Sequence, residues 1–406
     1  MKKIESPELK EFRAEVNQWL TENKPAKPDF PLPQSFTEVG NNDQFEYLKA
    51  WQNKVYEAGY LGMAWPVEYG GRGRPQELQD IVNQEMLNVR TPLMVNAVGL
   101  SWAGPTIMMH GTEEQKQKYI KPILTADEIW CQGFSEPGHG SDLGNVQTKA
   151  VRDPETGEYV LNGSKIWTTL AEQAAHMILL ARTDPDASNK YAGLSFFLSP
   201  MNSKGVEAKP IYKISKEYGF CQTFFDDARI PAESLMGEEG QGWMIAMSVL
   251  TFERGVTGGQ AGGNLFEIST VRDVHDTAVD CIRDGKPALE DDVLRDELID
   301  LYISERAQRL SKYRGEFSAL LVPERMHGLG LANKLVGSEG RQTLNAFAVK
   351  VQGNQAQLYM DDENALNGGL WQHGQLASFA GSIGGGTSEV QRNIIAERVL
   401  NLPKSR

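Results

Sequence analysis

At residues 130–142 the chain reads WCQGFSEPGHGSD, and the sequence pattern changes on either side of this stretch. Before it, apolar residues recur every three or four positions, as they do on the buried face of a helix. After it, short β-prone runs alternate with turn residues. The stretch itself holds glycines and a proline, which interrupt regular structure. We therefore predict an α+β protein in which this stretch joins a helical part to a β part.

The part before residue 128 is expected to be an N-terminal helical domain (residues 1–127). Helical spacing of apolar residues is found over residues 9–20, 45–55, 78–87 and 113–124. Pro7 stands where the first turn of the first helix would begin, and Thr112 is a plausible cap of the last. A glycine-rich loop, WPVEYGGRG, interrupts this helical pattern at residues 65–73.

The middle part, residues 128–236, is expected to be a β-barrel or β-sandwich. Runs of β-prone residues lie at 146–151, 159–161, 165–169, 176–181, 194–198, 206–211 and 223–230. Asn162-Gly163, between two of these runs, predicts a hairpin turn because both residues tolerate positive φ. Several short strands at this spacing are typical of a barrel or sandwich.

A second helical domain, residues 237–406, is expected to follow. Gly242-Trp243 opens a helix whose buried stripe is Ile245, Val249, Phe252 and Val256. Further helical patterns cover residues 292–310, 339–351 and 389–400. This order of elements, in which helices are followed by strands and then again by helices, is uncommon, so few known folds are compatible with it.

Composition limits the classes of partner and compartment. The 406 residues carry a net charge of −13, which argues weakly against a nucleic-acid or anionic-membrane partner. No run approaches the roughly 18 to 20 apolar residues of a membrane span, and no secretory signal is apparent at the N-terminus. Cys131, Cys221 and Cys281 lie too far apart for a disulfide framework. We expect a cytoplasmic protein.

Three segments besides residues 130–142 have a distinctive composition. They are residues 162–169 (NGSKIWTT), residues 237–243 with the later Phe252-Glu253-Arg254, and residues 385–398 (GGTSEVQRNIIAER). In this order and spacing, the four segments resemble the acyl-CoA dehydrogenase family. The resemblance implies a helical N-terminal domain, a middle β domain and a C-terminal four-helix bundle, with FAD between the last two. It also implies an acyl-CoA substrate, electron-transfer flavoprotein as acceptor, and a homo-tetramer or homo-dimer.

The resemblance also assigns expected cofactor contacts. Phe134 and Ser135 would face the pyrimidine edge of the flavin, and the segment through Gly140 and Ser141 would approach the FAD pyrophosphate and the CoA portion. The glycines would let the backbone come close to a ligand. A plain glycine turn between helix and strand is the alternative. His139, inside this segment, is expected to be a rim residue, since the histidines show no metal-ligand spacing.

Two more groups of cofactor residues follow from the resemblance. Trp167 would cover one face of the flavin ring, and Thr169, beside Thr168, would bond flavin N5. The alternative is that Trp167 belongs to the core of the β domain and that the threonines are ordinary strand residues. Thr387 and Glu389 open the last helix, where Glu389 could cap the helix, contact FAD, or do both.

The reaction needs a base that removes a proton from the carbon α to the thioester, while the flavin N5 accepts hydride from the β carbon. The family's commonest position for that glutamate is Gly385 here, which has no side chain. Some members supply it from the helix that opens the C-terminal domain, where Glu253 stands. Bordering an apolar stripe, Glu253 would have a raised pKa, as a base requires. A solvated or paired glutamate is the alternative. Arg254 would contact CoA, or form a surface ion pair.

Gly384 and Gly385 suggest a substrate class. The family often has an aromatic residue at the first position, so two glycines would enlarge the cavity above the flavin. The Gly385 N–H could still donate to the thioester oxygen, where charge develops. We expect a bulky, branched or ring-bearing acyl group.

A second departure from the family concerns residues 281–287, CIRDGKP, which stand where many relatives carry Arg-x-x-Phe-Gly. The arginine of that run meets the FAD pyrophosphate of a neighbouring subunit, and Arg283 or Lys286 could substitute for it. Three other functions remain open: an acyl-CoA oxidase or flavin monooxygenase with the same fold, a catalytically silent subunit of a hetero-oligomer, and a flavoprotein that binds DNA.

Overall fold

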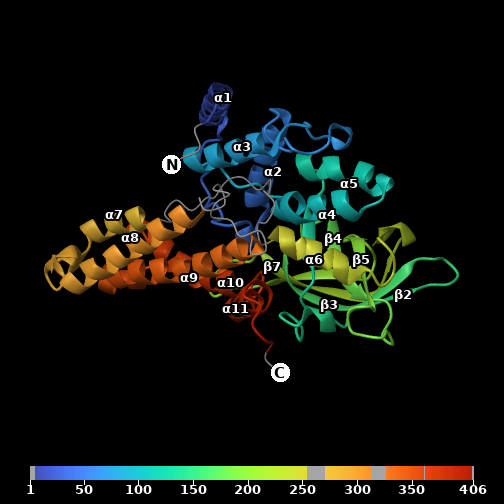
Figure 1. The fold of residues 1–406 in the computed structure, drawn as a ribbon. Coiled ribbons are helices and arrows are strands. Elements are labelled where there is room, and N and C mark those ends of the chain that lie inside the picture. The colour runs from blue at the N-terminus through green and yellow to red at the C-terminus, as the bar shows by residue number, and fades with distance from the viewer. Residues whose placement is uncertain (1–4, 254–269, 313–325, 361, 405–406) are drawn as a thin grey trace. The chain divides into compact units, whose positions relative to one another are not determined.

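The structure is a computed structural model that describes residues 5–253, 270–312, 326–360 and 362–404 (Figure 1). The chain divides into two compact units, Met1–Leu265 and Phe266–Arg406. Helices open the first unit, a β-sheet follows, and the second unit is mainly helical. The expected α+β class, with helical parts before and after the β part, is confirmed. The finer division at residues 127 and 236 stays a prediction.

The first unit begins with helices whose starts are fixed by the residues that the sequence places there. They are α1 (Pro7–Asn23), α2 (Asn42–Glu57), α3 (Gln76–Val89), α4 (Gly104–His110) and α5 (Glu113–Thr125). The Ser6 hydroxyl accepts from Leu9 N at the start of α1. Thr112 and Gln115 cap the start of α5 reciprocally, each side chain accepting from the other's backbone N–H. The predicted helices are confirmed.

A buried amide network ties these helices to the first strand of the sheet. The Asn96 side chain donates to Ile123 O at 3.1 Å and to Glu128 O at 2.9 Å. Its oxygen accepts from Trp130 N at 3.0 Å, and Trp130 opens β1. Gln52 accepts from Asn96 N at 2.9 Å. Because buried polar groups are costly to leave unpaired, this network fixes where the sheet begins.

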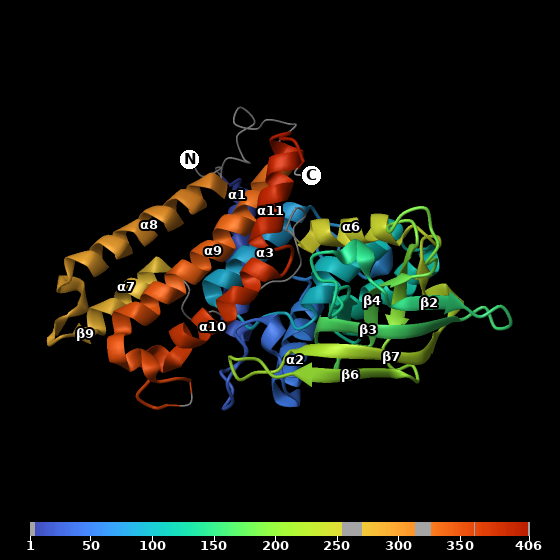
Figure 2. The same ribbon diagram turned by 90° about the horizontal axis from the view of Figure 1, so that it is seen from below.

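The strands of the first unit form one eight-stranded sheet with the order β6-β7-β3-β2-β4-β5-β8, and β1 pairs in parallel with β4. Figure 2 shows β6, β7 and β3 side by side in this sheet. The strands are β1 (Trp130–Gly133), β2 (Lys149–Arg152), β3 (Tyr159–Thr169), β4 (His176–Arg182), β5 (Leu194–Pro200), β6 (Val206–Ile211), β7 (Phe220–Ile230) and β8 (Leu235–Met236). Helix α6 (Gly242–Glu253) follows. Ile107, Ile178 and Ile245 share one buried core, so helices cover one face of the sheet.

The predicted hairpin at Asn162-Gly163 is wrong. Both residues lie inside β3, which runs without a turn from Tyr159 to Thr169 and pairs with β7. The register shifts between Leu161 and Gly163, and Gly163 has φ +145°. A Cβ at Gly163 would come within 2.8 Å of Thr148 Cα. Gly163 therefore lies at an irregularity in the strand pairing, where another backbone segment comes close, and not at a chain reversal.

The second unit is built around one long helix, α9 (Met326–Gln352), against which α7, α8, α10 and α11 pack. Its other elements are α7 (Val271–Asp280), β9 (Ile282–Arg283), β10 (Lys286–Pro287), α8 (Asp292–Lys312), α10 (Leu370–Ile383) and α11 (Ser388–Ile394). Trp371 is fully buried here and donates to the Thr277 hydroxyl at 2.9 Å. None of the helices in the described parts of the chain combines the length and apolar character that a bilayer crossing requires.

Candidate functional site

The segment after β1 leaves open space beside two of its glycines. Phe134 is buried and meets Phe196 edge to face, with ring centroids 5.9 Å apart. A Cβ built on Gly138 or on Gly140 would have no protein atom within 4 Å. These glycines are thus not required by close packing inside the first unit. The open space is what a backbone that approaches a ligand would need.

A buried ion pair fastens this segment to β3. The Lys165 ammonium is fully buried, donates to Glu136 Oε1 at 2.9 Å and donates to Phe134 O at 3.1 Å. Beside it, Ile166 N donates to Ser135 O at 2.9 Å. Residues 134–136 and 165–166 therefore form one rigid assembly. Sequence reasoning missed this pair, although both residues stand inside the quoted motifs.

The environment of the pair sets both ionisation states. Burial lowers the pKa of Lys165 to about 8, and the Glu136 carboxylate opposes this fall. Burial alone would raise the pKa of Glu136. Burial is the largest single effect, but the Lys165 charge and the hydrogen bonds from Lys165, Thr148 and Gln147 together outweigh it, so the pKa of Glu136 lies below its usual value. Each partner therefore favours the charged form of the other.

The end of β3 has an irregular backbone where the sequence predicts flavin contacts. The β3–β7 register shifts between Lys165 and Thr168, and Trp167 has φ +61°. Positive φ in a bulky residue is uncommon and strained. The Trp167 side chain is 56% exposed, so its placement in the core of the β domain is excluded. Its ring meets Phe220 edge to face, with centroids 6.0 Å apart.

Beside Trp167, one buried hydroxyl lacks a partner. Thr168 is fully buried, and its Oγ1 makes no hydrogen bond within the described residues. Thr169 is also buried, at 7% exposure. A buried hydroxyl without a partner is unfavourable, and a bound ligand with a polar edge would remove this cost. These residues therefore fit a polar heterocycle such as the flavin.

Glu253 ends the described part of α6. Its side chain is partly buried, and the stripe of Ile245, Val249 and Phe252 that precedes it is buried as predicted. The predicted Val256 and Arg254 lie outside the described residues. A hollow of about 220 Å³ adjoins this helix and is lined by Met109, Met247, Ser248, Thr251 and Phe252.

In the second unit, the turn at residues 384–387 is held by side chains that sequence reasoning missed. Gly385 and Gly386 both have positive φ, +66° and +89°. The Gln391 amide donates to Gly385 O at 2.9 Å, and the Lys334 ammonium donates to Gly386 O at 2.6 Å. Gln391 belongs to a quoted motif, whereas no sequence pattern marks Lys334.

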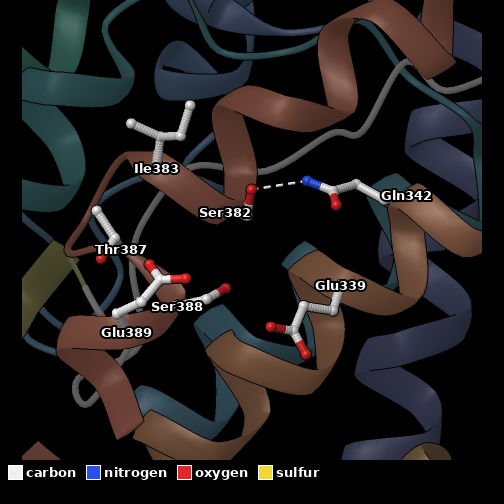
Figure 3. A pocket seen from close by; sticks show the side chains of 7 residues that line it. All are labelled: Glu339, Gln342, Ser382, Ile383, Thr387, Ser388 and Glu389. Carbon is white, nitrogen blue, oxygen red and sulfur yellow. Dashed lines mark hydrogen bonds between the residues drawn. The ribbon is translucent and has the colours of Figure 1, made fainter. Parts of the chain in front are cut away.

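A hollow of about 300 Å³ lies beside this turn (Figure 3). Its walls are formed by Glu339, Gln342, Ser382, Ile383, Thr387, Ser388 and Glu389. Thr387 and Glu389 were both predicted to contact the cofactor. The Thr387 hydroxyl caps α11 by accepting from Val390 N at 3.2 Å. Backbone N–H groups at this helix start, with Thr387, lower the pKa of Glu389.

The Ser388 hydroxyl also suits this hollow to a polar ligand. Ser388 is 6% exposed, and its Oγ has no hydrogen-bond partner among the described residues. Across the hollow, Gln342 donates to Ser382 Oγ at 2.6 Å (Figure 3). The hollow therefore combines hydroxyls, an amide and the start of α11 with two carboxylates, Glu339 and Glu389, a lining that suits sugar hydroxyls better than phosphates.

Residues 281–287 form a small hairpin in which β9 pairs with β10. Asp284 and Gly285 make its turn, with φ +51° and +77°. Arg283 donates to Lys350 O at 3.2 Å. Lys350 is near the C-terminal end of α9, whereas Glu339, in the wall of the 300 Å³ hollow, lies about three turns earlier. Arg283 is therefore separated from that hollow by roughly 16 Å along the helix.

The structure thus gathers the predicted residues into two groups. In the first unit, Ser135 is bonded to Ile166, the residue before Trp167, Thr168 and Thr169, so the start of the segment after β1 lies beside the end of β3. Gly384, Gly385, Thr387 and Glu389 form the second group, in the second unit.

Comparison with known proteins shows similarity along the chain. The models of the acyl-CoA dehydrogenase N-terminal, middle and C-terminal domains match residues 6–127, 131–228 and 240–400. Acyl-CoA dehydrogenase IpdE1 of Mycolicibacterium smegmatis is 38% identical over 409 residues, covering 98% of each chain. IpdE1 of Mycobacterium tuberculosis is 36% identical over 402 residues, also covering 98% of each.

Solved structures are similar over the same extent. The chain named "Tcur3481-Tcur3483 steroid ACAD" is 29% identical, with a TM-score of 0.79 and coverage of 100% of both chains. The ChsE4–ChsE5 complex from Mycobacterium tuberculosis supplies a chain that is 27% identical, with a TM-score of 0.80 and the same coverage.

Proposed function

Because the chain belongs to the acyl-CoA dehydrogenase family, an FAD-dependent family of oxidoreductases that act on the CH–CH bond of acyl-CoA, we propose that it oxidises a bulky acyl-CoA with Glu253 as the base. The observation that carries this proposal is that Glu253 is a partly buried carboxyl group in a chain whose residue 385 is a glycine. A member that lacks the usual glutamate needs another source of base. Glu253 ends an apolar helical stripe and can supply it.

Each of the two groups of residues described above offers candidate contacts for FAD. Bound FAD supplies the hydride acceptor. Phe134, Ser135, Gly140 and Ser141 would orient it along one edge, and Trp167, Thr168 and Thr169 along the ring. Thr387 and Glu389 would contact its sugar hydroxyls. The Thr168 and Ser388 hydroxyls, which have no hydrogen-bond partner in the described parts of the chain, support this assignment.

The base would act at the carbon next to the thioester carbonyl. Glu253 would take the α proton, since a carboxylate beside apolar side chains is a stronger base than one in water. Gly385 N–H would donate to the thioester oxygen as negative charge develops there. Ser141 and Arg254 would bind the CoA portion.

The substrate would carry branches or fused rings. Gly384 and Gly385 carry no side chains, so the space that we propose for the acyl group above the flavin would be wide, and one similar solved structure is named a steroid ACAD. A steroid-like acyl-CoA is therefore our first choice of substrate.

We further propose that the electron acceptor is an electron-transfer flavoprotein. The assembly would be a homo-tetramer or homo-dimer, and the protein would be located in the cytoplasm.

A catalytically silent subunit is the second candidate function. Gly385 favours it, and so do the names of similar structures that pair two different chains, ChsE4–ChsE5 and Tcur3481–Tcur3483. Such a subunit would share the fold but would need a partner chain to provide the reacting groups.

Anaerobic reduction of the flavin distinguishes these functions. The purified holoenzyme is mixed with a panel of straight-chain, branched and steroid-like acyl-CoAs, and absorbance near the flavin maximum is followed. We expect bleaching, and fastest with a bulky substrate. A protein that stays yellow with every compound would be a silent subunit. Rapid oxygen consumption after reduction would instead indicate an oxidase.

Replacing Thr168 with valine tests the cofactor assignment. The change removes one hydroxyl and keeps the shape, so we expect FAD to bind about tenfold more weakly, the effect of one lost hydrogen bond. Titration of apoprotein with FAD, followed by flavin fluorescence, measures this. Ser199→Ala is the control, because that hydroxyl on β5 is likewise buried without a partner in the described chain. Equal FAD affinity in Thr168→Val and the control would contradict the assignment.

A further inference from the structure

One peptide group of the first unit is held at its carbonyl end and free at its amide end. The Phe134 carbonyl accepts from the Lys165 ammonium at 3.1 Å. The other end of the same peptide group is the Ser135 N–H, which donates to no acceptor within residues 5–253. The next carbonyl, Ser135 O, accepts from Ile166 N at 2.9 Å. The backbone at Ser135 is therefore fixed in orientation, with one donor left for a ligand.

The charge that holds this peptide group is shielded from water. Lys165 is 0% exposed and Glu136 is 6% exposed. The Glu136 carboxylate accepts from Lys165, from Gln147 N at 2.6 Å and from Thr148 N at 2.8 Å. A cation that binds a carbonyl polarises the whole peptide group, and its N–H becomes a stronger donor. The effect is large here because the local dielectric constant is low.

We propose that Lys165 and Glu136 are positioning residues that aim and strengthen the Ser135 N–H as a donor to the pyrimidine edge of the flavin. The inference rests on the proposed function, which places Ser135 at that edge. A reduced flavin carries more negative charge at this edge than an oxidised one, and a stronger donor favours it. The pair would therefore tighten FAD binding and raise the reduction potential.

A purely structural role would not require charge. Neutral side chains of similar volume often hold a core as well as a buried ion pair does. Breaking the pair from one side leaves an uncompensated charge, whereas removing both charges does not. The single and double variants therefore separate the structural contribution of the pair from its effect on the flavin.

The test compares Lys165→Met with the double variant Lys165→Met/Glu136→Gln. In both we expect FAD to bind at least about tenfold more weakly. We also expect a lower midpoint potential, by about 30 mV for each tenfold loss of preference for the reduced form. Dye equilibration measures the potential. The double variant should nevertheless regain most of the thermal stability that the single variant loses.

Lys190→Met is the matched control. Lys190 pairs with Asp142 at 2.7 Å next to the same segment, but this pair is exposed. We expect FAD affinity and potential to match those of the wild type. A double variant that folds and keeps wild-type affinity and potential overturns the inference and leaves the proposed function standing. A wild-type protein that binds no FAD overturns both.

If neither variant folds, the midpoint potential of Lys165→Arg tests the inference instead. It keeps the charge but moves it relative to the Phe134 carbonyl. A changed midpoint potential supports the positioning role, and an unchanged potential overturns it.

Discussion

Replacing Glu253 with glutamine is expected to lower the rate of flavin reduction by an acyl-CoA about 10²- to 10⁴-fold, the usual contribution of a general base. The amide has the size of the carboxyl group but cannot accept the α proton. FAD content and the flavin spectrum should stay unchanged, because Glu253 is not among the expected cofactor contacts. Rapid mixing under anaerobic conditions measures the reduction step directly.

Glu46→Gln serves as the control for loss of one carboxylate, since Glu46 is exposed on α2. We expect its rate to lie within twofold of the wild type. Glu253→Asp should retain part of the activity, because the carboxyl group remains but lies one methylene further from the substrate. Full turnover in Glu253→Gln would rule out Glu253 as the base.

Moving the base gives a stricter version of this experiment. Adding Gly385→Glu to Glu253→Gln returns a carboxyl group to the position that most of the family uses. Gly385 has φ +66°, so the new side chain costs about 1–2 kcal/mol of backbone strain. We expect partial recovery of the reduction rate.

Replacing Gly384 with phenylalanine is expected to change substrate selectivity about 100-fold. Gly384 has φ −65° and ψ +154°, which any residue adopts. An added Cβ would lie 3.3 Å from Ala380 O, a tight contact, so this carbonyl must shift by a few tenths of an ångström to admit the ring. The ring would fill space proposed for the acyl group, so kcat/KM should fall for a steroid-like acyl-CoA and not for a short straight one. Steady-state kinetics on both substrates measure the ratio.

Gly384→Ala is the control for this change, because a methyl group adds little volume. Its selectivity should stay close to that of the wild type. Equal losses on both substrates in Gly384→Phe would mean that this position does not distinguish acyl groups.

Much of the first unit's secondary structure was predictable because its signals are local. Ser6 and Thr112 cap helices where the sequence places them. The buried stripe of Ile245, Val249 and Phe252 follows from helical spacing alone. The Asn162-Gly163 hairpin failed for the opposite reason. The same dipeptide suits a turn and a bulge, and only pairing with β7 decides between them.

The sequence by itself determined the order of helices and strands, the family, and the loss of a side chain at Gly385, because each depends on neighbouring residues or on a motif. The tertiary structure alone decided that Lys165 is buried against Glu136, 29 residues earlier, and that the Thr168 hydroxyl has no partner among the residues that the structure describes. Lys165 meets Glu136 where β3 lies against the segment after β1. A contact between segments that are distant in the sequence depends on which strands pair with one another, and no local spacing of residues encodes that pairing.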